Sequence, residues 1–310
     1  MTLAIETSEL TKRFGKVTAL HNADLAVETG SVFGVIGPNG AGKTTTMRLL
    51  LDIIRPSSGS IRVLGEEPGS GGRALRRQIG FLPGELRLEG RVRGRDLLHH
   101  YARISGPVAP GAIERLAERL ELDLGRQVRT LSKGNKQKLG LVQAFMHEPR
   151  LLVLDEPTSG LDPLVQQEFL AMVREAKDNG QTVFLSSHVL SEIEQAADSV
   201  AILNAGRIVT VSDVESLRAS ATRKIRVRIV DASVETVHRT FTSLELVSDL
   251  AVDESDGVRV AAHVEGDIDR VVKALAQFHV SELTVQEQDL EESVLRLYSV
   301  DLGAGEGSDQ

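Results

Sequence analysis

The stretch GPNGAGKTT, Gly37–Thr45, decides the fold of this chain of 310 residues. Two glycines with four residues between them precede a lysine and a threonine, which is the pattern of a loop that wraps phosphate. Glycine lets the backbone approach an anion without a Cβ clash, and the N–H groups of the loop and of the following helix attract its charge. The pattern predicts a nucleotide phosphate site made by Gly37, Asn39, Gly40, Ala41, Gly42, Lys43, Thr44 and Thr45.

Both flanks of this loop have the expected character. Val32–Ile36 is a short apolar run that predicts a strand, and Thr45–Ile54 has apolar residues at helical spacing. In this setting Lys43 is expected to reach the β- and γ-phosphate oxygens, and the hydroxyl of Thr44 is expected to bind Mg²⁺.

A second informative stretch is LLVLDEPTSGLD, Leu151–Asp162. Its apolar start predicts a parallel strand buried on both faces, and two carboxylates follow at the end where open α/β sheets bind ligands. Asp155 is expected to hold Mg²⁺, and Glu156 to orient or deprotonate the attacking water. An acidic pair is also typical of an ordinary turn, but the phosphate loop favours the catalytic interpretation.

Together with LSKGN at Leu131–Asn135 and SSH at Ser186–His188, these segments closely resemble the ATP-binding subunits of ABC transporters over about Leu3–Leu217. The resemblance implies a P-loop NTPase (RecA-like) α/β cassette with an antiparallel β subdomain and a helical subdomain. It also implies ATP and Mg²⁺ as ligands, with hydrolysis in sites shared between two chains. Ser132 and Gly134 would touch the γ-phosphate bound to a second subunit.

Further roles come from the same resemblance. Asp162 would lie on a loop that crosses the dimer interface, and His188 would sense the γ-phosphate and help hold the water. Phe14 would stack on adenine. Taken alone, His188 is also typical of a polar loop, and Phe14 of a core position.

Two segments depart from the family pattern. Lys133 and Asn135 replace a glycine and a glutamine in the LSKGN segment, whose serine and second glycine remain. More seriously, Gly84 stands in IGFLPGE, Ile79–Glu85, where the family has a glutamine that completes the magnesium shell. Either Glu85 takes this role after a shift of one residue or water does, and a carboxylate suits Mg²⁺ better than an amide does.

Composition fits a transporter ATPase that has no membrane span of its own. The formal net charge is −8 and there is no cysteine, so disulfides and thiolate metal sites are excluded. No apolar run approaches the roughly 18 residues of a membrane span. The resemblance then implies a separate membrane permease as partner, a location at the cytoplasmic face of the membrane, and a homodimer because all the site motifs lie on one chain. Acidity argues against nucleic acid as a partner.

Arginines are frequent on both sides of Ile79–Glu85, the lid segment: Arg73, Arg76, Arg77, Arg87, Arg91, Arg93, Arg95 and Arg103. They are typical of a solvated helical face. The alternative is a surface that meets anionic headgroups or acidic residues of the permease.

The rest of the cassette is predicted to form a helical arm followed by alternating helices and strands. Helices are expected at Asp96–Ile104 and Ala112–Leu122. Later elements are a helix at Pro163–Asp178, a strand at Thr182–Ser186, a helix at Ser191–Ala197 and a strand at Ser199–Asn204. Such alternation predicts a parallel sheet covered on both faces.

A second unit is predicted at residues 218–302. Its elements are expected in the order βαββαβ of a small ferredoxin-like α+β domain, followed by a helix at Asp289–Tyr298 and a disordered tail at 303–310. Its histidines, His238, His263 and His279, lack metal spacing. The unit resembles accessory domains of bacterial drug and antibiotic exporters, and we expect it to brace the dimer or regulate its closure.

The sequence therefore predicts an ATPase that powers export of a drug, antibiotic or other hydrophobic small molecule. One alternative is a soluble ABC-type ATPase acting on nucleic acid or ribosomes, which usually has paired cassettes or long coiled-coil insertions. Another is a nucleotide-gated module that does not hydrolyse ATP. Lys43, Asp155, Glu156 and His188 argue against that module, whereas the glycine at position 84 favours it.

Overall fold

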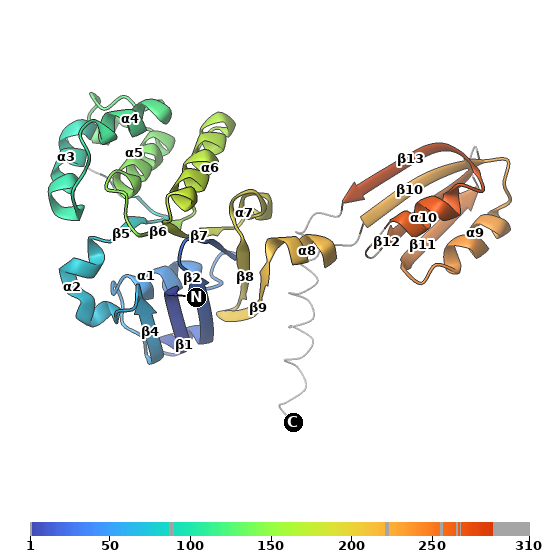
Figure 1. Cartoon of the computed structure of the whole chain (residues 1–310), viewed down its shortest axis with the longest axis horizontal. Coiled ribbons are helices and arrows are strands. Elements are labelled where there is room, and N and C mark those ends of the chain that lie inside the picture. Colours follow the sequence, from blue (N-terminus) through green and yellow to red (C-terminus); the bar gives the residue numbers. More distant parts are fainter. Residues whose placement is uncertain are drawn as a thin grey trace. The chain divides into compact units, whose positions relative to one another are not determined.

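The computed structural model describes residues 2–86, 88, 90–220, 223–254, 257–264, 266 and 268–287 (Figure 1). The predicted helix at Asp289–Tyr298, the predicted tail and Arg87 lie outside these residues. The chain forms two compact units that divide between Asp213 and Val214, slightly before the boundary expected at residues 217 and 218. Each unit has a hydrophobic core of its own.

Two sheets form the frame of the first unit. The smaller is antiparallel and has the order β2-β1-β4, with β1 (Leu3–Phe14), β2 (Val17–Glu28) and β4 (Ser58–Val63). The larger has the order β5-β6-β7-β3-β8-β9, with β3 (Val32–Ile36), β5 (Ile79–Leu82), β6 (Leu151–Asp155), β7 (Thr182–Ser187), β8 (Ser199–Asn204) and β9 (Arg207–Asp213). Its strands are parallel except that β9 runs antiparallel to β8. The predicted cassette fold and the strand at Val32–Ile36 are confirmed.

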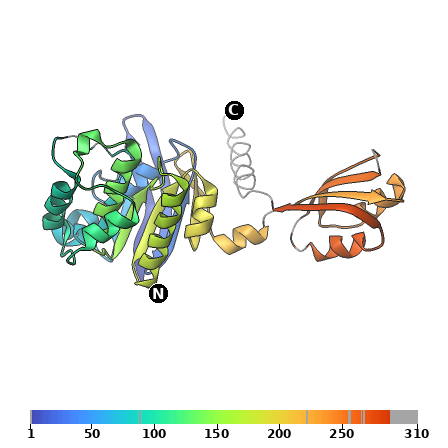
Figure 2. The same ribbon diagram turned by 90° about the horizontal axis from the view of Figure 1, so that it is seen from above.

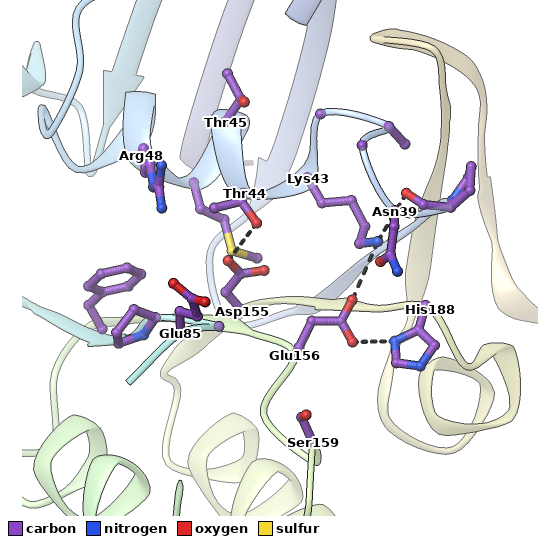
Figure 3. A pocket seen from close by; sticks show the side chains of 18 residues that line it. Asn39, Lys43, Thr44, Thr45, Arg48, Glu85, Asp155, Glu156, Ser159 and His188 are labelled. Atoms are coloured by element: carbon purple, nitrogen blue, oxygen red, sulfur yellow. Dashed lines mark hydrogen bonds and ion pairs between the residues drawn. The ribbon is translucent and has the colours of Figure 1, made fainter. Parts of the chain in front are cut away.

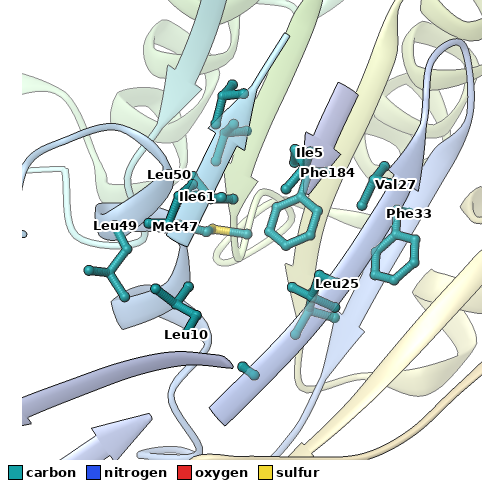
Figure 4. Close-up of a cluster of buried hydrophobic side chains, with 14 of the residues drawn as sticks. Ile5, Leu10, Leu25, Val27, Phe33, Met47, Leu49, Leu50, Ile61 and Phe184 are labelled. Atoms are coloured by element: carbon teal, nitrogen blue, oxygen red, sulfur yellow. The ribbon is translucent and has the colours of Figure 1, made fainter. Parts of the chain in front are cut away.

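The core of the first unit lies between these sheets, around α1 (Lys43–Leu50). Met47, Leu49 and Leu50 of α1 pack into it, while Phe33 of β3 and Phe184 of β7 stack with ring centroids 5.8 Å apart (Figure 4). The helix begins earlier and ends earlier than the predicted Thr45–Ile54. It ends because Asp52 takes a φ of 53°, which a right-handed helix does not accommodate.

The helical arm lies to one side of the larger sheet (Figure 1). The helices of the first unit besides α1 are α2 (Pro68–Arg76), α3 (Gly94–Ser105), α4 (Ala112–Arg119), α5 (Lys133–Phe145), α6 (Pro163–Asp178) and α7 (Leu190–Ala196), with a 3₁₀ turn at Val128–Thr130. Arg119 ties α4 to α6 by donating to Glu168 at 2.6 Å and to Glu175 at 2.7 and 2.8 Å. These hydrogen bonds lower the pKa of the Glu175 carboxyl.

The second unit begins with α8 (Val214–Ser220) and continues in the expected βαββαβ order. Its elements are β10 (Arg223–Val230), α9 (Val234–Thr242), β11 (Val247–Glu254), β12 (Val258–Val264), α10 (Asp269–Leu275) and β13 (His279–Glu287). The sheet is antiparallel with the order β11-β12-β10-β13. Buried residues of α9 and α10 form one core with Ile225, Val227 and Ile229 of β10, so both helices cover the same face (Figure 2). The ferredoxin-like classification stays a prediction.

Candidate nucleotide site

The phosphate loop leaves β3 and enters α1 directly. Gly40 and Gly42 have φ values of 84° and 112°, which side chains of L-residues rarely adopt. A Cβ at Gly37 would lie 2.3 Å from the carbonyl oxygen of Leu203, so β8 requires a glycine there. Lys43 is 7% exposed, and its Nζ donates to the carbonyl oxygen of Gly37 at 2.6 Å. The loop is therefore shaped by its own glycines and by β8.

Asp155 ends β6 and faces the start of α1. It is 1% exposed and accepts hydrogen bonds from the hydroxyls of Thr44 at 2.8 Å and Ser186 at 2.7 Å. A buried carboxylate beside a threonine hydroxyl is a donor set of the kind that binds Mg²⁺ together with nucleotide phosphates. Thr44 and Asp155, two of the three residues predicted to hold the metal, thus fit that role chemically.

Glu156 lies between a cation and a histidine (Figure 3). Its carboxylate is 3.4 Å from Lys43 Nζ and 2.5 Å from His188 Nδ1. Its side chain is 19% exposed and that of His188 is 58% exposed, so the histidine lies at the open side of the site. The arrangement provides a carboxylate and an imidazole that can together hold a water molecule.

These groups line one cavity of about 480 Å³. Of the predicted site residues it brings together Asn39, Gly40, Ala41, Gly42, Lys43, Thr44, Thr45, Glu85, Asp155, Glu156 and His188. Gly37, Phe14, Ser132, Gly134 and Asp162 are not in its lining. Gly37 instead lies behind the loop, against β8.

The lid segment forms the wall next to Asp155. A Cβ at Gly84 would lie 3.1 Å from Asp155 Oδ2, and the next residue, Glu85, lines the cavity with its side chain (Figure 3). Phe81 and Pro83 line the same wall. The position after Gly84 therefore presents a carboxylate to the cavity.

Ser132, Gly134 and Asp162 lie at helix starts outside the cavity. Ser132 Oγ caps α5 by accepting from Asn135 N at 3.3 Å, and Asp162 Oδ1 caps α6 by accepting from Val165 N at 3.1 Å. The N-termini of these helices are suitable for anion binding. Their role toward a second subunit stays a prediction.

Phe14 is an exposed residue at the end of β1. Half of its surface is accessible, so the core interpretation does not apply. The ammonium of Lys12 lies 4.9 Å from its ring centroid. Stacking on adenine stays a prediction.

The arginines around the lid are divided between partnered and open positions. Arg76 pairs with Asp52 at 3.3 Å, and Arg77 donates to the carbonyl oxygen of Ile104 at 3.4 Å. Arg73, Arg91, Arg93 and Arg103 are exposed. Both interpretations of this surface remain open. Over the described part of the chain, no helix has the length and apolar character needed to cross a membrane.

Sequence reasoning missed several groups that shape the site. Ser186 belongs to the SSH segment and holds both Asp155 and the backbone N–H of Glu156. Gln137 donates to the backbone of Glu156 from α5. Arg48 lines the cavity from the helix that the phosphate loop opens. The SSH segment was available as a signal for Ser186; the role of Gln137 depends on a tertiary contact that its helix does not reveal.

A phosphate loop at the start of a helix, a buried Asp beside it and a Glu–His pair across the cavity define a nucleoside-triphosphate hydrolase of the phosphate-loop class. Comparison with known proteins specifies the family. Residues 20–159 match the model of the family described as ABC transporter. The chain is 32% identical to the bacitracin transport ATP-binding protein BcrA of Bacillus licheniformis over 96% of this chain and 98% of BcrA. It is 34% identical to the daunorubicin/doxorubicin resistance ATP-binding protein DrrA of Streptomyces peucetius over 95% and 90%.

Solved structures match the first unit. An ATP-binding subunit of an ABC transporter is 31% identical, with a TM-score of 0.65 over 70% of this chain and 92% of that one. A dimeric ATP-binding cassette in a post-hydrolysis state with ADP and Pi has a TM-score of 0.63 at 18% identity, over 68% of this chain and 98% of that one, which bears on the fold alone. The chain belongs to the family of ABC transporter ATP-binding subunits. It is an ATPase of a kind whose cassettes dimerise and work with a membrane permease.

Proposed function

We propose that this chain powers export of an antibiotic or another hydrophobic small molecule through a separate permease, as a homodimer at the cytoplasmic face of the membrane. The observation that carries the proposal is the similarity to BcrA and DrrA. It extends over 96% and 95% of this chain and so includes the second unit as well as the cassette. The cassette alone supports ATP hydrolysis, while this full-length similarity supports the class of cargo.

In the proposed cycle, the phosphate loop binds the triphosphate of ATP. The backbone from Gly37 to Gly42 surrounds the phosphates, Thr45 adds its backbone N–H in the first turn of α1, and Phe14 stacks on adenine. Lys43 exchanges its bond to the Gly37 carbonyl for the β- and γ-phosphates. The loop carbonyl thus keeps the lysine oriented within the loop before ATP arrives.

Thr44, Asp155 and Glu85 would hold Mg²⁺. The support is the hydroxyl–carboxylate pair of Thr44 and Asp155, 2.8 Å apart, and the presence of Glu85 in the same cavity. When bound, the metal neutralises charge between the β- and γ-phosphates. Ser186 keeps Asp155 in place from the other side.

Glu156 orients the attacking water and accepts its proton. His188 hydrogen-bonds with the Glu156 carboxylate and contacts the γ-phosphate. The Glu156–His188 contact of 2.5 Å and the Lys43–Glu156 contact of 3.4 Å support this assignment. Ser132, Gly134 and Asp162 of a second copy complete the site. Because no covalent intermediate is needed, catalysis consists of positioning and charge stabilisation.

The test is ATPase activity of the chain purified together with its permease, comparing wild type with Glu156→Gln. Loss of a general base predicts that kcat falls about a hundredfold or more while ATP binding is retained. Glu28→Gln, at the exposed end of β2, is a matched control that should keep full activity. Equal low activity in wild type and Glu156→Gln would identify a nucleotide-gated module without hydrolysis.

The same preparation tests the cargo. Bacitracin and daunorubicin are suitable probes because they are named for two relatives that match nearly the whole chain. Stimulation of the wild-type rate by such a compound, absent in Glu156→Gln, supports an exporter. No stimulation by either compound or by chemically similar ones would contradict the proposed cargo and leave the ATPase assignment intact.

A further inference from the structure

Three side chains of α5 contact residues 156–162, the segment that carries Glu156. Lys133 Nζ donates to Ser159 Oγ at 3.1 Å, and Lys138 Nζ lies 3.9 Å from Asp162 Oδ2. Between them, Gln137 Nε2 donates to the carbonyl oxygens of Glu156 at 3.1 Å and Pro157 at 3.0 Å. Residues 133–138 of α5 therefore contact the 156–162 segment at its start, in its middle and at its end.

Gln137 is the most deeply buried of these three side chains, ahead of Lys138, which is 7% exposed. Gln137 is 3% exposed, so loss of its amide would leave the buried Pro157 carbonyl without this donor and the Glu156 carbonyl with only the N–H of Ser159, at 3.2 Å. Removing one partner of a buried hydrogen bond usually costs more than the bond contributes. Gln137 is therefore held firmly to the backbone beneath the catalytic carboxylate.

The backbone of Glu156 needs such support. Its φ is 50°, in the left-handed region that is unfavourable for a residue other than glycine. Its N–H is directed to Ser186, 3.2 Å from the carbonyl oxygen and 3.1 Å from the hydroxyl, and its carbonyl accepts from Gln137. Glu156 is thus held from β7 on one side and from α5 on the other. This dihedral angle sets the direction in which its carboxylate meets Lys43 and His188.

The start of α5 lies very close to the 156–162 segment. A Cβ at Gly134 would lie 2.5 Å from the carbonyl oxygen of Gly160, so this approach requires glycine. Lys133, which replaces a glycine of the family pattern, reaches Ser159 in the wall of the cavity. A shift of the LSKGN segment cannot leave the 156–162 segment in place without breaking these contacts.

We propose that Gln137 is a positioning residue of Glu156, and that Lys133 extends the same link to Ser159. Movement of LSKGN, when a second subunit closes on it, then reorients the hydrolytic carboxylate of its own chain. The inference rests on the proposed function, in which Glu156 acts on water and LSKGN serves a second copy.

The first variant is Gln137→Met, which keeps a similar length and removes the donor. A carboxylate displaced by about 1 Å predicts that kcat falls between about tenfold and a hundredfold, with ATP affinity unchanged. Gln166→Met is the matched control, because Gln166 Nε2 also donates to a carbonyl of this segment, that of Leu161 at 3.2 Å, without touching Glu156. A fall in kcat that is equal in both variants would overturn the proposal.

The deciding measurement adds Gln137→Met to Glu156→Gln. If Gln137 acts through Glu156, adding Gln137→Met lowers the residual kcat of Glu156→Gln by less than about twofold, because the effects of coupled residues are not additive. A full further loss would show that Gln137 acts otherwise and would overturn the proposal. Wild-type activity in Glu156→Gln alone would instead refute the proposed function.

If Gln137→Met fails to fold, Lys133→Met provides a second test, since Lys133 is exposed. It should lower kcat severalfold with ATP affinity unchanged, whereas Lys136→Met, on the same helix, should leave kcat unchanged. Identical kcat values for both lysine variants and wild type would contradict the link from Lys133 to Ser159.

Discussion

Among single residues, Gly84 and Glu85 of the lid segment line the cavity together with Asp155, the residue proposed to bind Mg²⁺. A side chain at position 84 would begin 3.1 Å from Asp155 Oδ2 and 3.2 Å from its Cγ, a distance at which a neighbour has to shift. Glycine therefore leaves Asp155 in its contacts with Thr44 and Ser186. In the proposed site, Glu85 would supply the metal ligand that a glycine at position 84 cannot.

Glu85→Ala should raise the Mg²⁺ concentration required for half-maximal ATPase activity, because one oxygen ligand of the metal is lost. Gly84→Gln should fail to restore it, since the new side chain meets Asp155. The measurement is a Mg²⁺ titration at fixed ATP for wild type, Glu85→Ala and the double variant. An unchanged titration midpoint in Glu85→Ala would mean that water completes the shell.

The residues of the site that sequence could predict are those whose role is set locally. The phosphate loop, Asp155 and Glu156 follow from glycine pattern and from carboxylates at the end of an apolar run. Gln137 and Ser186 are 19 and 30 positions away from the Glu156 backbone atoms they hold, so only the folded chain brings them there. The apolar spacing that predicted a helix to Ile54 did not reveal the left-handed Asp52 that ends α1.

At the scale of elements, His147 lies where the helical arm joins the sheet. It lies two residues after the end of α5, is 8% exposed, and is beside Gly106 at the end of α3. Burial lowers the pKa of its imidazole, with the Ile79 backbone acting in the opposite sense. Among the described residues, neither ring nitrogen has a partner at hydrogen-bond geometry, so the Ile79 backbone opposes the effect of burial only weakly.

This burial predicts a loss of stability in acid. The folded-state pKa lies below the unfolded value of 6.5, so the unfolded chain binds a proton that the folded chain does not. Stability from this group is complete above the unfolded pKa and declines as the pH falls below it. His147→Leu should remove that part of the decline, measured by denaturant unfolding between pH 8 and pH 5.5. His99→Leu, at an exposed position of α3, should retain it; equal declines in all three proteins would contradict the prediction.

At the scale of the whole molecule, the two units differ in what they can do alone. The cassette has its own core, and one solved ATP-binding subunit is matched over 92% of its length by 70% of this chain. BcrA and DrrA match nearly the whole chain, so the second unit is shared with relatives named for antibiotic transport and resistance. The cassette thus has a core and a solved counterpart of its own, and the second unit has counterparts in BcrA and DrrA.

A chain truncated after Thr222 should therefore fold and bind ATP, yet lose coupling. Without the second unit to brace the dimer or regulate its closure, we expect the ATPase rate with the permease to fall about fivefold or more, the size of an ordinary coupling between sites. ATP affinity, dimer content by sedimentation and the rate in the reconstituted complex separate these effects. Unchanged ATP affinity with a lower rate or lower dimer content supports the role. A truncated complex with full activity would contradict it, because the second unit would then be dispensable for the motor.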